Sequence, residues 1–251
     1  MFQIVGKHIF RLNMVDSTNN YANSQLREKE LEEGTVFLAY EQSNGRGQLK
    51  NFWESEPGSN LTFSIVLFPD FLDIRKQFML SKVVSLGIYT ALSKYVADLR
   101  VKWPNDIYAG DRKLGGILIE NSIMYSSIKS SVIGIGINVN QTHFVSDAPN
   151  PVSLSTLTNK TYDCDLILAE LSAGIDSYYS LLKQNEDQRI NQEFLSVLYR
   201  YREKHWFKDQ LGRFEGEIVG VNKIGQLLVR KSDDRTMSYH FKEVEFLQSP
   251  D

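Results

Sequence analysis

Cysteine is nearly absent from the sequence, since Cys164 is the only one among 251 residues. One thiol can form neither an internal disulfide nor a cysteine-rich metal site, so the chain suits a reducing compartment. Long apolar runs are missing as well. No stretch approaches the roughly 18 apolar residues of a membrane span, and residues 1–14 lack the apolar core of a secretory signal. We therefore expect a cytoplasmic protein with no membrane partner.

The sequence also lacks an excess of positive charge. It has 28 Lys and Arg residues against 31 Asp and Glu residues, which gives a formal net charge of −3. A protein dedicated to nucleic acid usually presents a strongly basic face, so we expect no DNA partner. With 42% hydrophobic residues, the composition is that of a globular protein. The length allows one sizeable core and a small second module.

Strand and helix signals follow one another irregularly along residues 1–205, which predicts an α+β fold with a mixed β-sheet packed against helices. The predicted strands are 9–15, 35–40, 61–67, 101–103, 106–108, 114–120 and 131–139. The predicted helices are 21–32, 70–96, 163–183 and 189–201, with Asp70 as the cap of the second one. Residues 109–112 form a hairpin signal between two of the strands.

The pattern changes after Trp206. Short strands at 213–219, 226–230, 236–241 and 244–247 are separated by tight turns, one of them at residues 222–225. Several short strands in about forty residues indicate a small β-barrel. We therefore predict two domains, one over residues 1–205 and a C-terminal one over residues 206–251.

The loop from Gln42 to Trp53 is polar and too long for a tight turn. Gly45 and Gly47 flank Arg46, so the backbone can approach a ligand closely while a positive charge is held beside it. That arrangement suits a phosphate or a carboxylate. The alternative is an ordinary flexible loop that ends in a buried core tryptophan.

A second segment, residues 102–106, places Pro104 inside a strand pattern, as happens at a strand end, an edge or a bulge. Asn105 and Asp106 at that break offer oxygen ligands that could hold Mg²⁺ beside phosphates. The alternative is a turn in which both side chains bind the local backbone.

A third segment places Lys113 just before Gly115 and Gly116 in a predicted strand. Two strand glycines reduce stability unless something must come close to the backbone. A lysine over that gap could neutralise a transferring phosphoryl or acyl-phosphate group. A surface lysine before a bulge explains the pattern equally well.

In a fourth segment, Ile133 to Asn140, the odd positions are apolar and the even ones are Gly134, Gly136, Asn138 and Asn140. One face of this strand is therefore bare backbone followed by two amides. Such a face can serve as the floor of a ligand site or of a packed helix. Asn138 could then bind the edge of a purine.

Together, these segments resemble the biotin–protein ligases over roughly residues 9–160, in the family's order and spacing. The motifs that carry the resemblance are Ser-Thr-Asn at 17–19, Gln-x-x-Gly-Arg-Gly from Gln42 with a later tryptophan, Lys-Trp-Pro-Asn-Asp at 102–106, Arg-Lys-x-x-Gly-Ile-Leu-x-Glu from Arg112 to Glu120, and Gly-x-Gly-x-Asn from Gly134 to Asn138.

The resemblance implies a catalytic domain of the class II synthetase or biotin–lipoate ligase type and a C-terminal SH3-like domain. It implies ATP-dependent conversion of biotin to biotinyl-5′-AMP, with Mg²⁺, and transfer to a lysine of a biotin carboxyl carrier domain of acetyl-CoA carboxylase or a related carboxylase. A homodimer is compatible with it.

The resemblance also implies roles for individual residues. Arg46 and Lys113 would be catalytic. Biotin would be bound by Ser17, Thr18, Asn19, Gln42, Arg46, Gly47, Gln48, Lys113, Gly115 and Gly116. ATP and the adenylate would be bound by Arg46, Trp53, Lys102, Asn105, Asp106 and Asn138, with Asn105 and Asp106 at the metal.

The loop departs from the family's frequent Gly-Arg-Gly-Arg-x-Gly-Arg. Gln48 replaces the second arginine, and Lys50 and Asn51 replace the following Gly-Arg. The departure concerns how tightly the intermediate is retained, and Lys50 would restore part of the lost charge. Some members also carry an N-terminal helix-turn-helix domain. The first ligase strand begins by about residue 9 here, so we expect the monofunctional type.

Two alternatives remain. A lipoate–protein ligase or octanoyltransferase shares the catalytic fold, but the Arg-Arg-x-x-Gly-Gly-Gly loop of those lipoate ligases is absent, and Cys164 between Asp163 and Asp165 is poorly placed for a nucleophile. A non-catalytic biotin or nucleotide sensor that binds nucleic acid is the other. Its support is the run of basic and aromatic residues at 199–206, which a helix end also explains.

Overall fold

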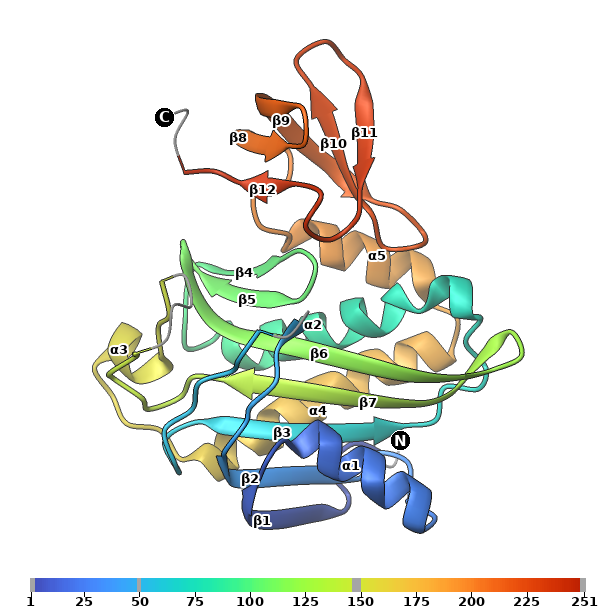
Figure 1. The fold of residues 1–251 in the computed structure, drawn as a ribbon, viewed down its shortest axis with the longest axis vertical. Coiled ribbons are helices and arrows are strands. Elements are labelled where there is room, and N and C mark those ends of the chain that lie inside the picture. The colour runs from blue at the N-terminus through green and yellow to red at the C-terminus, as the bar shows by residue number, and fades with distance from the viewer. Residues whose placement is uncertain (1–2, 49–50, 146–149, 249–251) are drawn as a thin grey trace.

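The computed structural model describes residues 3–48, 51–145 and 150–248. Its larger sheet has seven strands in the order β1-β2-β3-β7-β6-β5-β4, and a second sheet has five strands in the order β11-β10-β9-β8-β12 (Figure 1). In the first sheet β1 and β2 are parallel and the remaining neighbours are antiparallel. The predicted α+β fold with a mixed sheet and a second, smaller β-structure is confirmed.

The elements have the following bounds. The first sheet consists of β1 (Ile9–Val15), β2 (Val36–Gln42), β3 (Leu61–Leu67), β4 (Leu99–Lys102), β5 (Asp106–Ala109), β6 (Arg112–Met124) and β7 (Ser127–Ile137). The second consists of β8 (Lys204–Asp209), β9 (Gly212–Val221), β10 (Leu227–Lys231), β11 (Thr236–Tyr239) and β12 (Glu245–Phe246). The α-helices are α1 (Thr18–Glu28), α2 (Phe78–Leu92), α3 (Leu154–Thr158), α4 (Cys164–Lys183) and α5 (Asp187–Ser196).

Helices cover both faces of the larger sheet, with α2 and α4 on one side and α1 on the other (Figure 1). Strand β3 is therefore buried at every position. Its side chains alternate between the faces, so Phe63 and Ile65 belong to the main core and Val66 to a small cluster with α1. The α1 cluster consists of Ala22, Phe37, Val66 and Val132. The sheet can thus carry a site on the α1 face without weakening the main core.

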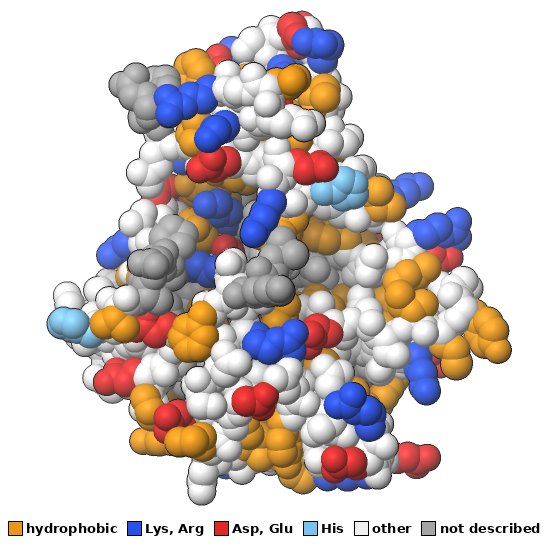
Figure 2. Space-filling model, viewed as in Figure 1, with side chains coloured by type: hydrophobic (Ala, Val, Ile, Leu, Met, Phe, Trp, Pro, Cys, Tyr) orange, Lys and Arg blue, Asp and Glu red, His pale blue; other side chains and the backbone are white. Residues whose placement is uncertain are grey.

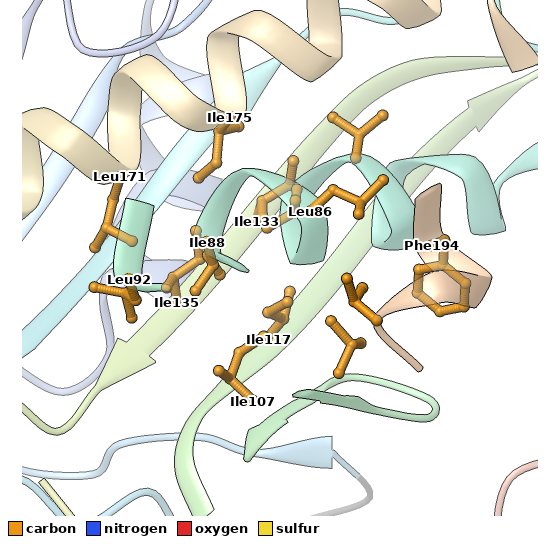
Figure 3. Packing of buried hydrophobic residues seen from close by; sticks show 14 of the residues in the cluster. Leu86, Ile88, Leu92, Ile107, Ile117, Ile133, Ile135, Leu171, Ile175 and Phe194 are labelled. Carbon is orange, nitrogen blue, oxygen red and sulfur yellow. The ribbon is translucent and has the colours of Figure 1, made fainter. Parts of the chain in front are cut away.

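Two glycines bring α2 and α4 into close contact. A β-carbon on Gly87 would lie 2.5 Å from the backbone of Ile175, and one on Gly174 would lie 2.4 Å from the carbonyl oxygen of Gly87. The helices can therefore approach closely, and Leu171 and Ile175 of α4 point toward α2 in Figure 3. Below them, α2 packs on Ile133 and Ile135 of the sheet (Figure 3).

Several predicted elements differ from the structure. The predicted helix at 70–96 is wrong at its start, because Pro69 and Asp70 form turns and Asp73 caps only a 3₁₀ turn at Ile74–Lys76 before α2. The predicted helix at 189–201 ends at Ser196, since Arg200 and Arg202 have positive φ angles. Helix α1 starts three residues earlier than predicted, and strand β8 was not predicted.

The second sheet contacts the larger one through the turns around β4 and β5. Trp103 Nε1 donates a 2.8 Å hydrogen bond to the carbonyl of Gly225, and the rings of Tyr199 and Phe246 lie 6.2 Å apart. Strand β8 begins at Lys204, close to the predicted domain boundary. The division into 1–205 and 206–251 stays a prediction, as does the SH3-like character of the second part.

None of the helices in the described part of the chain is both long and apolar enough to cross a bilayer.

We expect Gly87→Ala to destabilise the protein although alanine favours helix by about 1 kcal/mol over glycine. The new β-carbon would meet the backbone of Ile175, which cannot move without separating α2 from α4. Overpacking of this kind costs about 1–3 kcal/mol, so urea unfolding should show a net loss of stability. Thr90→Ala, at an exposed position of the same helix, is the control and should not lower stability. A gain of stability in Gly87→Ala would contradict the packing.

Candidate active site

A pocket opens on the α1 face of the larger sheet, where predicted residues from distant parts of the sequence meet. Its cavity volume is about 110 Å³. The surface is hollowed between the two sheets in Figure 2, and Lys and Arg side chains gather around this hollow. The predicted residues that line the pocket are Ser17, Thr18, Asn19, Gln42, Arg46, Gly47, Gln48, Trp53, Asn105, Asp106, Lys113 and Gly116. Twelve of the predicted residues therefore line one cavity, and their roles stay predictions.

One end of the pocket is formed by the N-terminus of α1. Ser17 has an extended backbone and the helix begins at Thr18, whose N–H donates a 2.7 Å hydrogen bond to Gln42 Oε1. The hydroxyl of Ser64 lies 2.7 Å from both Thr18 Oγ1 and Asn19 Oδ1. Hydroxyls and amides thus make this end rich in both donors and acceptors.

The floor of the pocket is the bare face of β7. A β-carbon on Gly134 would lie 2.4 Å from Asn19 Oδ1, and one on Gly136 would lie 2.3 Å from the indole of Trp53. The two glycines therefore let one side chain from α1 and one from the loop lie directly on the strand. The predicted bare strand face is confirmed, and both a helix residue and a loop residue use it.

Lys113 stands over the middle of the pocket and is already paired. Its Nζ lies 2.7 Å from Asp106 Oδ1, with about a fifth of each side chain exposed. The ammonium also lies 5.9 Å from the ring centroid of Trp53. This position follows from the β5–β6 pairing, in which Lys113 is opposite Tyr108 and Gly116 is opposite Asp106.

Arg46 lies beside α1, and its partner was not predicted. Arg46 Nη2 lies 2.7 Å from Oε1 of Glu120 on β6, and Nη1 donates a 2.6 Å bond to Asn20 Oδ1. Glu120 ends the Arg-Lys-x-x-Gly-Ile-Leu-x-Glu motif. It could have been suspected from that motif, because it is a charged residue inside a strand.

Three predicted residues do not line the pocket. Gly115 faces Ile137. Asn138 is buried, and its Nδ2 donates to the carbonyl of Val152. Lys102 lies 4.4 Å from the ring centroid of Tyr108, and burial lowers its pKa. The predicted ligand contacts of these residues stay predictions.

Phe241, from the segment after β11, lines the pocket and was not predicted as a site residue. Nothing local in the sequence indicates this, since the residue arrives through the packing of the second sheet, where its ring lies 6.4 Å from that of Trp103. Lys50, whose charge was expected to compensate for Gln48, is outside the described residues.

Two polar atoms of the pocket residues are buried without a partner among the described residues, namely Gln48 Oε1 and Trp53 Nε1. Buried polar groups are nearly always hydrogen-bonded, so orphaned ones in a pocket indicate a missing ligand or water. The cavity is smaller than the roughly 300–1,000 Å³ of ordinary ligand pockets. A large ligand therefore requires movement of Trp53 or of its loop.

A divalent cation would find two oxygen-bearing side chains here. Asn105 uses its Nδ2 for a 2.7 Å bond to the carbonyl of Ile117, and the carboxylate of the next residue, Asp106, is paired with Lys113 at 2.7 Å. Among the described residues no group of three or more His, Cys, Asp or Glu side chains is placed to bind a metal. The pair fits Mg²⁺ that takes most of its ligands from phosphates and water.

Comparison with known proteins gives one consistent family. The sequence profile of the biotin/lipoate A/B protein ligase family matches residues 12–138. Biotin–protein ligase 1, chloroplastic, of Arabidopsis thaliana is 38% identical over 232 residues, which is 84% of this chain and 59% of that protein. The bifunctional ligase/repressor BirA of Bacillus spizizenii is 31% identical over 140 residues.

Among solved structures, the biotin protein ligase from Aquifex aeolicus in complex with biotin and ATP is similar with a TM-score of 0.80 and 26% identity. The similarity covers 97% of this chain and 100% of that one. The match to the Bacillus protein, by contrast, covers 55% of this chain and only 42% of that relative's length.

We expect Gly136→Ala to displace Trp53 from the strand, because the added methyl group would overlap the indole. The chain has three tryptophans, so 5-fluorotryptophan labelling should give three fluorine resonances, of which the Trp53 signal should shift. Gly220→Ala on β9 is the matched control, since a β-carbon there would meet only Leu228 at 3.8 Å. An unchanged spectrum in Gly136→Ala would show that the indole does not lie on Gly136.

Proposed function

The chain belongs to the biotin/lipoate A/B protein ligase family, and within that family we propose that it is a biotin–protein ligase. One observation carries the proposal. One cavity is lined by the polar end at α1, by Lys113 and by Arg46, which come from distant parts of the sequence. A reaction between a carboxylic acid that has a polar head group and a nucleoside triphosphate needs hydrogen-bonding groups for the head and cations for the carboxylate and phosphates. These groups must lie close together.

The reaction would run in two steps. A carboxylate oxygen of biotin attacks the α-phosphorus of ATP, forming a mixed anhydride while the bond to pyrophosphate breaks. The amine of a carrier lysine then attacks the carbonyl carbon, an amide forms, AMP leaves and the amine releases a proton. In the first step negative charge develops on the departing pyrophosphate, and in the second it develops on the carbonyl oxygen and on the departing phosphate of AMP.

The N-terminal end of α1 suits the head of biotin. A ureido ring carries one carbonyl and two N–H groups, and hydroxyls of Ser17 and Thr18 with the amide of Gln42 can both donate and accept. The dithiolane ring of lipoate offers no comparable hydrogen bonds and would leave these groups unpaired, at a cost in affinity. The pocket therefore favours biotin over lipoate.

The cations suit the reacting centre. Lys113 stands between the polar end and Asp106, where it can neutralise charge on the carboxylate and the α-phosphate as they react. Arg46 would bind the same oxygens from the loop. Asn105 and Asp106 would hold Mg²⁺, which when bound would screen the charge of the triphosphate. Trp53, whose indole N–H has no partner among the described residues, would move from Gly136 to cover the adenine.

The rival functions find less support. Burial raises the pKa of Cys164, and Asp163 and Asp165 raise it further, so a nucleophilic thiolate for octanoyl transfer is disfavoured. Arg200, in the basic and aromatic run after α5, is used within the molecule. The guanidinium of Arg200 lies 4.9 Å from the ring centroid of Tyr199 and bonds to the carbonyl of Leu247. This residue is therefore poorly available for nucleic acid.

The proposed acceptor is the lysine of a biotin carboxyl carrier domain of acetyl-CoA carboxylase or a related carboxylase, with no DNA partner. The proposal includes Mg²⁺ as the metal and a catalytic unit over residues 1–205 with an SH3-like unit over residues 206–251. A cytoplasmic location suits a chain with one cysteine.

The direct test is to incubate the full chain with ATP, Mg²⁺ and a biotin carrier domain, adding biotin in one sample and lipoate in another. Intact-mass spectrometry should show the carrier gaining one biotinyl group, and pyrophosphate should be released before transfer. A carrier whose lysine is replaced by arginine is the control and should gain nothing. Modification by lipoate but not by biotin would contradict the proposal.

We expect Lys113→Ala to lower the rate of adenylate formation about 10²–10³-fold, the usual effect of removing one preorganised electrostatic group. Folding should change little, because the side chain is partly exposed and the partner carboxylate of Asp106 can gain water. Lys183→Ala is the matched control, since Lys183 forms a 2.7 Å ion pair with Glu33 away from the pocket. Adenylate formation at the normal rate in Lys113→Ala would exclude the proposed role.

A further inference from the structure

Glu120 links α1 to the loop that carries Arg46. Its carboxylate, 30% exposed, accepts a 2.9 Å hydrogen bond from Asn19 Nδ2 and a 3.3 Å bond from Asn23 Nδ2. The same carboxylate accepts from Arg46 Nη2 at 2.7 Å and from Arg46 Nη1 at 3.4 Å. One side chain of β6 therefore contacts both the polar end on α1 and the cationic loop.

The bonds to Arg46 use one edge of the guanidinium. Nη1 is bonded to Asn20 and Glu120, and Nη2 is bonded once to Glu120. The N–H of Nε and the second N–H of Nη2 have no hydrogen-bond partner among the described residues. These two form the other fork of the planar group, which matches a carboxylate or phosphate in a bidentate manner. Arg46 can thus keep Glu120 and still bind an anion.

Glu120 also fixes the amide of Asn19. A carboxylate only accepts hydrogen bonds, so the side-chain nitrogen of Asn19 must face it while the oxygen faces Ser64. The carbonyl of Leu118 accepts from the same nitrogen at 3.3 Å. Asn19 is 2% exposed and its oxygen lies against Gly134. The orientation of this residue is therefore fixed by the acceptors on β6, Glu120 and Leu118, and by the hydroxyl of Ser64.

We propose that Glu120 is a positioning residue that aims the free fork of Arg46 at the anionic part of the ligand and so determines how long the activated intermediate is retained. The inference rests on the proposed function, because it needs an anionic adenylate in the pocket. The carboxylate of Glu120 also repels an anionic ligand. That repulsion acts across the guanidinium and between partly exposed groups, where salt and water screen it. Orientation is the larger effect.

The test is Glu120→Gln, which keeps the size of the side chain but supplies one acceptor oxygen and places an NH₂ group against at least one donor, Arg46 Nη2 at the position of Oε1. We expect the rate of biotinyl-adenylate release from the full chain to rise about tenfold, the factor that corresponds to a loss of about 1.4 kcal/mol of binding free energy. The midpoint of unfolding should change no more in this variant than in the control variant. Glu217→Gln is the matched control, since Glu217 forms a 2.8 Å ion pair with Arg230 in the second sheet.

A merely structural role is separated from a positioning role by a double-mutant cycle. If Glu120 acts through Arg46, Glu120→Gln should add nothing to the release rate of an Arg46→Ala variant. Release at the wild-type rate in Glu120→Gln, or effects that multiply in the double variant, would overturn the inference while leaving the proposed function standing. Wild-type protein that forms no biotinyl adenylate from biotin and ATP would instead overturn the proposed function, and this inference with it.

Discussion

Two missing side chains in a central strand make the pocket possible. At Gly134 and Gly136 the strand β7 presents only backbone to the α1 face, while its neighbours Ile133 and Ile135 point into the main core. Any larger residue at the two glycine positions would meet Asn19 or Trp53 at once. The α1 terminus and the loop can therefore approach the sheet only because this strand is bare, and the cavity is the space left between them.

The opposite face supplies the stability that such a site requires. Glycine in a strand weakens the sheet and contributes no apolar contact, so the strand that carries the site must be held from its other side. Helices α2 and α4 hold it there, and their own close approach depends on Gly87 and Gly174. Glycines thus serve close packing in the core and open backbone in the pocket, and only the surroundings distinguish the two uses.

Sequence patterns predicted the parts of the site that depend on local order. The glycine-bearing strand, the loop around Arg46 and the position of Lys113 before a hairpin strand are consequences of short-range periodicity and motif spacing. Long-range packing was not accessible in this way. Phe241 reaches the pocket through the second sheet, and Asn138 lies outside the residues that line it although it is two positions from Gly136. The helix predicted from Asp70 starts only at Phe78, because the apolar spacing of Phe71, Ile74 and Phe78 also runs through a turn and a 3₁₀ turn.

The charges of the pocket are neutralised in pairs before any ligand arrives. Lys113 faces Asp106 at 2.7 Å and Arg46 faces Glu120 at 2.7 Å, both on pieces of β-structure and each pair joining different elements. Leaving a cation unpaired at this partly buried site would carry a cost, because each side chain has lost part of its hydration. Pairing removes that cost and fixes the orientation of each cation. An anionic ligand therefore gains only the hydrogen bonds that each cation can form in addition to those with its partner carboxylate. An ammonium has three rotatable donors and a guanidinium has a second fork, so both can serve two anions at once. Pairing of the two cations in the empty pocket is therefore compatible with strong binding of an anionic ligand.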